Sequence, residues 1–187
     1  MPKGLFKGIA AFGVIAALGA TSAQAQSSRI TVGAGGGIAI PLGDYSDATK
    51  TGWDLTGAVQ VKPATSPVGF QIDGTYQENK FDPSSIGKFR WFYGTGDIVF
   101  WLPVAEETRI RPYLLGGGGV YNFKQKFTTG TSGSSQTKFG INVGAGFDFD
   151  FQSNVGIFLE GRFHNVFIQG SDAKFIPVNV GIRFHTK

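Results

Sequence analysis

The residues best suited to catalysis lie between Glu160 and Asp172. Glu160, Arg162 and His164 recur at every second position, and Ser171 and Asp172 follow a few residues later. A histidine beside a carboxylate can act as a general base on a serine hydroxyl. The same spacing also suits a histidine that is held by hydrogen bonds within a network of charges and has no catalytic role. We favour this second interpretation.

Two further acids, Asp148 and Asp150, could hold a hard cation such as calcium. The interpretation that we favour is a solvated strand end that carries two charges. The chain has two histidines and no cysteine, too few ligands for a zinc site. The glycine run that begins at Val32 lacks the third glycine of a dinucleotide-binding fingerprint. We therefore expect no metal and no cofactor.

The segment that carries these two acids has a period of two residues. From Phe139 to Phe151 every odd position is apolar, and every even position is glycine or polar. This is the pattern of a β-strand with one apolar and one polar face. Ordinary strands have about five or six residues, whereas a tilted strand needs roughly nine to eleven to cross a bilayer. The pattern therefore predicts a strand whose apolar face meets lipid.

The same alternation predicts eight strands along the chain. Their ranges are 30–42, 52–62, 68–77, 89–102, 110–123, 139–151, 155–167 and 175–184. Two of them alternate less cleanly, because Val99 and Trp101 fall on the polar side of one and glycines 116–119 interrupt the other. A bulge could shift either register. Short turns alternate with longer polar loops, as in an up-and-down membrane barrel.

The first 25 residues have the features of a secretory signal peptide. Lys3 and Lys7 precede a short apolar run, and a small-residue site predicts cleavage between Ala25 and Gln26. Residues 26–187 would then form one barrel domain. The leader carries two lysines and no acid, so its removal lowers the formal net charge from +4 to +2. That small charge gives no support to nucleic-acid binding.

The polar faces of the predicted strands carry most of the charged residues. Unpaired backbone groups are costly in hydrocarbon, so the last strand must pair with the first and the polar faces must line the interior. The predicted lumen charge network consists of Asp54, Asp73, Asp97, Arg111, Asp148, Glu160, Arg162, His164 and Arg183. The apolar faces carry almost no charge, with Glu78 and Arg90 as exceptions at strand ends. Eight strands leave room inside for side chains only, so we expect no wide pore.

Aromatic residues concentrate near the predicted strand ends. We expect them to form interfacial girdles at headgroup depth, where amphipathic rings are favoured. The predicted girdle residues are Trp53, Tyr76, Phe89, Trp91, Phe100, Trp101, Tyr121 and Phe123.

Two segments, RPYLLGGGGVY at 111–121 and PVNVGIRF at 177–184, resemble the small outer-membrane β-barrel proteins of the OmpA and OmpX type. The resemblance covers residues 30–184. It implies an all-β fold, an eight-stranded antiparallel up-and-down transmembrane β-barrel in the bacterial outer membrane, with both termini in the periplasm. It also implies a C-terminal signal, read by the outer-membrane assembly machinery, at Asn179, Gly181, Ile182 and Phe184. The chain departs from the pattern by continuing past Phe184.

Three functional hypotheses follow from the resemblance. The favoured one is a monomeric structural or surface-interaction protein in contact with membrane lipid and lipopolysaccharide. The second is a narrow channel for ions or small solutes, and the third is a lipid-modifying enzyme. A deacylase of the third kind has a serine two residues after its histidine, whereas Val166 occupies that position here. We therefore expect no enzymatic activity.

Overall fold

A computed structural model describes residues 28–105, 108–151 and 154–185. The predicted signal peptide and its cleavage site between Ala25 and Gln26 lie outside the described residues. The strands are β1 (Arg29–Leu42), β2 (Gly52–Lys62), β3 (Val68–Lys80), β4 (Gly87–Trp101), β5 (Ile110–Phe127), β6 (Gln136–Asp150), β7 (Val155–Val166) and β8 (Ala173–His185). A short helix, α1 (Asp44–Ala48), follows β1. Across the described residues, no helix is both long and apolar enough to cross a membrane.

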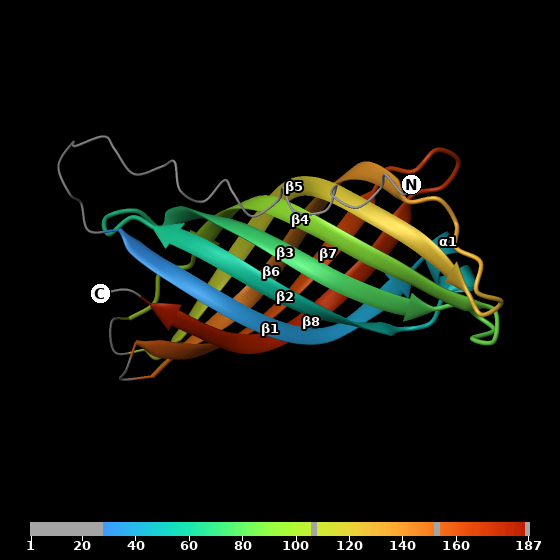
Figure 1. Cartoon of the computed structure of the whole chain (residues 1–187). Helices are drawn as coiled ribbons and strands as arrows, with labels where there is room; N and C mark the ends of the chain where they lie inside the picture. Colours follow the sequence, from blue (N-terminus) through green and yellow to red (C-terminus); the bar gives the residue numbers. More distant parts are fainter. Residues whose placement is uncertain (1–27, 106–107, 152–153, 186–187) are drawn as a thin grey trace, which may run out of the picture.

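The strands form one closed antiparallel barrel (Figure 1). Each strand pairs with the next in the chain, and β8 pairs with β1. The predicted eight-stranded up-and-down barrel is therefore confirmed. The register between β4 and β5 runs from Gly87 opposite Phe127 to Trp101 opposite Tyr113 without a skipped residue. The two strands with imperfect alternation thus keep a regular register, and no bulge shifts them.

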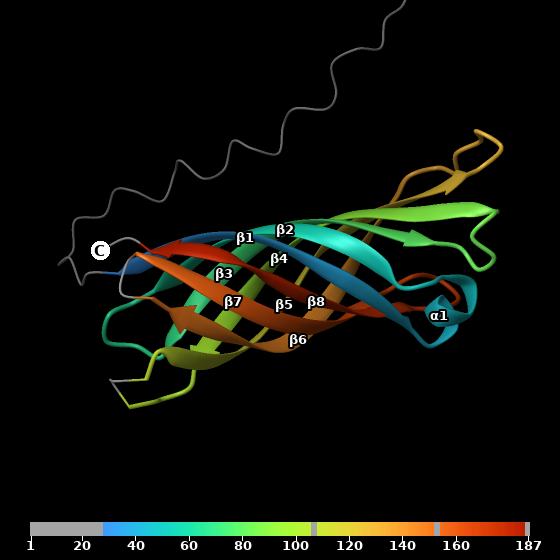
Figure 2. The ribbon, with the colours of Figure 1, turned by 90° about the horizontal axis from the view of Figure 1, so that it is seen from below.

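The two ends of the barrel differ. The turn end holds Arg29, His185 and the connections after β2, β4 and β6, and the loop end holds α1 and the connections after β3, β5 and β7 (Figure 1). At the loop end the hairpin of β5 and β6 splays away from the barrel axis (Figure 2). There β3 continues to Lys80 and β5 to Phe127, beyond their predicted ends. Polar and charged residues can extend the strand ladder beyond the apolar segment because water solvates their side chains.

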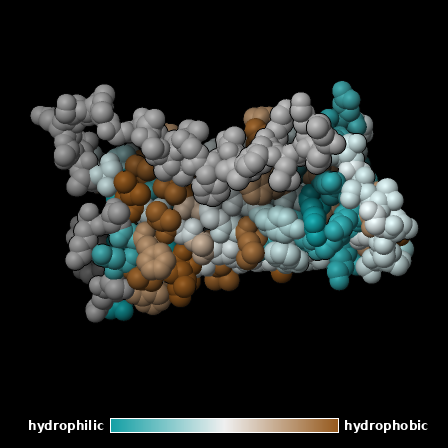
Figure 3. All heavy atoms as spheres, viewed as in Figure 1, coloured by the Kyte–Doolittle hydropathy of each residue, from teal (hydrophilic) through white to brown (hydrophobic). Residues whose placement is uncertain are grey.

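The barrel is apolar outside and polar inside. Phe70, Ile72 and Val143 point outward and are 61%, 68% and 60% exposed, whereas Asp54 and Gln77 are buried in the interior. Hydrophobic residues gather over the turn end and the middle of the visible face, and hydrophilic ones lie toward the loop end (Figure 3). Soluble monomers rarely expose contiguous apolar surface on this scale. The outer wall is therefore built to contact hydrocarbon, as the alternation predicts.

Candidate functional site

The centre of the lumen is occupied by Arg162 and three acids. Arg162 Nη1 lies 2.6 Å from Asp73 Oδ1 and 3.0 Å from Asp97 Oδ2. Arg162 Nη2 lies 2.7 Å from Glu160 Oε1. All four residues are buried. Buried charges are tolerated when they are paired and hydrogen-bonded. One guanidinium thus holds together acids from β3, β4 and β7.

A second guanidinium extends this network toward the turn end. Arg183 pairs with Asp148, and its Nη2 lies 3.3 Å from Glu160 Oε2. Tyr113 Oη accepts a hydrogen bond from Arg183 Nη2 and donates one to Glu160 Oε2. The charged lumen network therefore comprises Asp73, Asp97, Asp148, Glu160, Arg162 and Arg183, with Glu160 linking its two arginines.

Two predicted members of the network, Asp54 and Arg111, lie elsewhere. Asp54 is buried but makes neither arginine ion pair, and it is in register with Gly37 on β1. Arg111 is the second residue of β5, so its partly exposed side chain lies at the rim, where Nη1 is 3.3 Å from Asp150 Oδ2. Arg29 reaches the same carboxylate oxygen at 3.4 Å. The alternation gives the side of the wall but not the depth along the barrel.

His164 is the third predicted member that lies outside the central network. It points inward and is buried, with Nδ1 2.7 Å from Tyr121 Oη and its ring stacked on Phe175 at 5.0 Å. Ser171 Oγ instead donates to Asp44 Oδ2 at 2.7 Å. Because these groups have separate partners, the general-base arrangement considered from the sequence is not assembled.

Aromatic side chains fill the loop-end half of the lumen. The buried cluster there consists of the aromatic residues Tyr45, Trp91, Tyr93, Tyr121, Phe123 and Phe175, together with Val166 and Ala173. Tyr45 comes from α1, and its hydroxyl accepts a hydrogen bond of 2.8 Å from Trp91 Nε1. Burial raises the pKa of the Tyr45 phenol above its ordinary value, so the ring stays neutral. Helix α1 therefore places a side chain in the lumen at the loop end of the barrel.

Two buried clusters correct the predicted aromatic girdles: the loop-end cluster, and a second one that consists of Val99, Trp101, Tyr113 and Leu115. Trp91, Trp101, Tyr121 and Phe123 are 1%, 6%, 0% and 7% exposed and lie inside the barrel. They occupy the strand positions that share a side with the lumen acids, where the sequence alone does not distinguish a buried ring from an interfacial one. Phe89 is partly buried and packs against the loop-end cluster.

The other three predicted girdle residues, Trp53, Tyr76 and Phe100, behave differently. Trp53 and Phe100 are 45% and 39% exposed on the outer face. The ring centroid of Tyr76 lies 5.5 Å from the ring centroid of Trp53. For these rings, interfacial depth stays a prediction.

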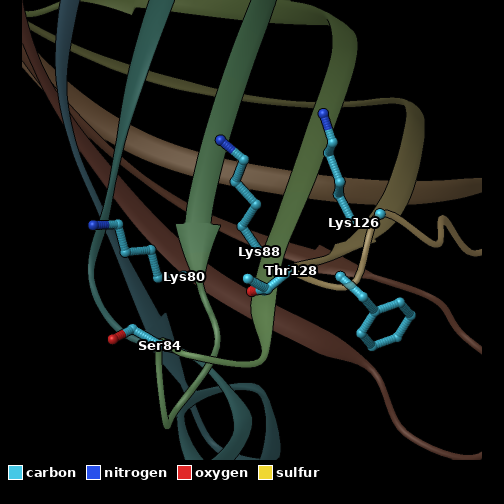
Figure 4. A pocket seen from close by; sticks show the side chains of 8 residues that line it. Lys80, Ser84, Lys88, Lys126 and Thr128 are labelled. Carbon is cyan, nitrogen blue, oxygen red and sulfur yellow. The ribbon is translucent and has the colours of Figure 1, made fainter.

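Lysines gather around a pocket on the outer face of the loop end. The pocket has a volume of about 370 Å³ and is lined by Lys80, Ser84, Gly87, Lys88, Lys126, Phe127, Thr128 and Gly130. Lys88 on β4 is in register with Lys80 on β3 and with Lys126 on β5. Figure 4 shows Lys88 and Lys126 extending in the same direction from neighbouring strands, with Lys80 and Ser84 to one side. Three lysine side chains thus line one pocket.

A second row of charges lies two residues closer to the middle of the barrel on the same strands. Arg90 on β4 is in register with Glu78 and with Lys124. Glu78 accepts from Lys88 Nζ at 2.7 Å and from Arg90 Nε at 3.0 Å. We name Lys80, Lys88, Arg90, Lys124 and Lys126 the basic face. The exceptional positions of Glu78 and Arg90 were visible in the sequence, but the cluster depends on the register of three strands.

The residues of the predicted C-terminal signal lie on both sides of β8. Asn179 is buried in the lumen, and Gly181 is on the same side of the strand. Ile182 and Phe184 point outward and are 50% and 58% exposed. Phe184 is in register with Val32 on β1 and with Val155 on β7, where the barrel closes.

Comparison with known families agrees with this geometry. Residues 10–184 match the family described as outer membrane protein beta-barrel domain. The chain belongs to this family. No curated protein matches the sequence. The apolar wall of this outer-membrane β-barrel is therefore the surface that contacts membrane lipid.

Solved structures similar to this outer-membrane β-barrel come from several bacteria. Neisserial surface protein A is 15% identical, with a TM-score of 0.64 over 84% of this chain and 96% of that chain. Ail of Yersinia pestis, in complex with the heparin analogue sucrose octasulfate, is 17% identical, with a TM-score of 0.59 over 85% and 99%. A major outer membrane protein of Thermus thermophilus is 10% identical, with a TM-score of 0.63 over 86% and 100%. At these identities the likeness is one of fold.

Proposed function

We propose that this outer-membrane β-barrel is a non-catalytic surface protein that acts through its loop end and conducts no solute through a wide pore. The loop end faces the outside of the cell, and both termini lie in the periplasm after cleavage between Ala25 and Gln26. The contrast between a filled interior and an open basic pocket at the loop end carries this proposal.

The packing of the lumen supports the absence of a wide pore. Phe158 lies over Gly35 and Gly181, and a methyl group on either glycine would come within 2.7 Å of its ring. The charged lumen network occupies the middle of the same space, and Tyr45 lies at its loop end. A solute would have to displace several buried side chains in order to pass.

The basic face supports a role in contacting anions. Lysine and arginine bind phosphate and sulfate groups through charge-assisted hydrogen bonds. Ail, which shares the fold, is described in complex with a sulfated sugar analogue. We propose that the basic face of this chain contacts phosphate or sulfate groups at the cell surface.

The remaining partners belong to the same proposal. Membrane lipid and lipopolysaccharide surround the barrel, which is monomeric. The outer-membrane assembly machinery recognises β8 through Asn179, Gly181, Ile182 and Phe184.

A narrow channel is the second candidate function, because amide and hydroxyl groups line one side of the lumen. Gln60, Gln71, Thr75 and Gln77 are all buried there. Insertion of the purified barrel into planar bilayers separates the two functions. We expect no steady conductance, and a reproducible conductance step would favour the channel. Deletion of the protein should leave the mass spectrum of cellular lipid A unchanged, whereas a shifted mass would indicate an enzyme.

A further inference from the structure

We infer that the basic face is a binding site for the phosphate groups of a glycolipid of the surrounding outer leaflet, namely lipopolysaccharide. The inference rests on the proposed function, because it requires the loop end to face outward. It goes further by naming the source of the anion and the residues that hold it.

The direction of the side chains is the first argument. Lys80 lies on the same side of β3 as Ile72, and Lys88 on the same side of β4 as Phe92, because each pair is separated by an even number of residues. Lys126 lies on the same side of β5 as the outward-facing Val120. Ile72 and Phe92 are 68% and 58% exposed on the outer wall. Because alternate residues share a face of a strand, the basic face points sideways from the barrel, toward neighbouring lipids.

The depth of the side chains is the second argument. On β3 the lipid-facing residues run from Val68 to Tyr76, and Glu78 and Lys80 follow on the same face. At about 3.3 Å per residue and a 45° tilt, the two rows lie roughly 5 and 9 Å beyond Tyr76. The headgroup layer begins at that boundary and is about 5–7 Å thick, so the row of Glu78 lies within it and the row of Lys80 lies just beyond its outer edge, within reach of a long lysine side chain. Tyr76 Oη donates to Glu78 Oε2 at 3.3 Å, which marks the boundary with an amphipathic ring.

The charge balance is the third argument. The basic face holds five cations, and Glu78 is the one carboxylate paired with it among the described residues, which leaves a net charge of +4. Like charges directly opposite each other on neighbouring strands destabilise a sheet. Within the described part of the chain, Lys80, Lys124 and Lys126 form no ion pair. An external anion with several charges would offset this repulsion.

The pocket itself is held in place by the loops. Thr128 Oγ1 donates to the Ser85 carbonyl at 2.7 Å, and Thr128 N donates to the Ile86 carbonyl at 3.0 Å. Gly87 lets the two backbones approach, because a methyl group there would lie 2.2 Å from the Lys126 carbonyl oxygen. The pocket is therefore formed before a ligand arrives, which lowers the entropic cost of binding.

The neighbouring surface favours a lipid over a soluble glycan. On the membrane side of the basic face, Phe92 follows Arg90 on the outer face of β4 and is 58% exposed. Ile72, 68% exposed, lies farther along the outer face of β3, beyond Tyr76. A lipopolysaccharide carries acyl chains for that apolar wall and phosphates for the lysines, whereas a soluble polyanion can use the lysines only. We therefore assign the site to the glycolipid.

The test uses the folded full-length mature chain in detergent with EDTA, titrated with purified lipopolysaccharide. The variant Lys80→Gln/Lys126→Gln removes two charges of the basic face, and Lys138→Gln/Lys174→Gln removes two other lysines near the loop end. Heat-dependent gel migration verifies that both variants fold. We expect about a tenfold loss of affinity in the first variant and less than a twofold change in the second. Dephosphorylated lipopolysaccharide should bind the parent about as weakly as lipopolysaccharide binds the first variant.

Equal affinity of parent and first variant for lipopolysaccharide would overturn the inference, as would equal binding of the dephosphorylated form. A second titration with sucrose octasulfate separates the inference from the proposed function. If this soluble anion binds through Lys80 and Lys126 but lipopolysaccharide does not, the surface role stands and the glycolipid assignment is wrong. If neither binds, the anion-contact part of the proposed function is wrong as well.

Discussion

Gly146 on β6 and Tyr113 on β5 lie directly opposite each other inside the barrel. A methyl group at position 146 would come within 2.4 Å of both Cζ and Oη of Tyr113. The phenol therefore lies across a position that only glycine leaves open, and its hydroxyl reaches Glu160. The abundance of glycine in these strands thus has a packing reason: it makes room in a narrow lumen for large side chains.

Gly146→Ala should lower the free energy of unfolding by about 1–3 kcal/mol, because the methyl group would displace Tyr113. Gly74→Ala is the matched control, since no atom lies within 4 Å of a methyl group at that outward position. Urea unfolding of the barrel in lipid bilayers measures both. Equal losses for the two variants would mean that the lumen is less tightly filled than the contacts imply.

Arg162→Met should destabilise the barrel by about 3–5 kcal/mol, because it leaves buried carboxylates without their cation. Adding Asp73→Asn and Asp97→Asn to Arg162→Met should recover part of that loss, because these changes remove two of the three carboxylate charges around position 162. The same bilayer unfolding assay applies. No recovery in the combined variant would show that the arginine acts by packing and not by charge.

Val143→Arg should cost roughly 2–4 kcal/mol, because it places a cation at mid-bilayer depth on the lipid face. Val143 is 60% exposed at the centre of the outward row of β6. Val143→Ile, which keeps the apolar character, should change stability by less than about 1 kcal/mol. If arginine is tolerated as well as isoleucine, the outer face of β6 is not in hydrocarbon.

Phe184→Ser should reduce the amount of barrel in the outer membrane several-fold, because the aromatic residue is part of the proposed assembly signal. Val180→Ser is its control on the same strand and face, and the two residues are 58% and 56% exposed. Immunoblots of outer-membrane fractions give the comparison. A similar decrease in both variants would point to general loss of lipid contact.

The strands and their inward side were predictable because a single period of two specifies both. Asn142, Asp148 and Glu160 all lie inside as the alternation requires. The turn-end position of Arg111 follows from its place as the second residue of the predicted strand 110–123, but its pairing with Asp150 and not with the central acids did not follow from the alternation alone. The interior aromatic cluster was missed for a related reason: Trp91 and Tyr121 are apolar on a face that also carries acids, and the sequence alone does not show which rings stack across the lumen.

The basic face was the least accessible feature. Lys80, Lys88 and Lys126 are separated by eight and thirty-eight residues along the chain, and only the register of β3, β4 and β5 makes them neighbours. All three lie in loops between the predicted strands, where a lysine is ordinarily solvated and carries no signal. The outward charges of Glu78 and Arg90 were the one indication that the sequence offered.

The most direct test of the account is the immersion depth of its outer wall. The chain has no cysteine, so single cysteines at positions 72 and 126 can carry nitroxide labels in a barrel reconstituted in bilayers. The account predicts that the label replacing Ile72 collides mainly with dissolved oxygen and that the label replacing Lys126 collides mainly with a water-soluble nickel chelate. Strong nickel access at position 72 would contradict it.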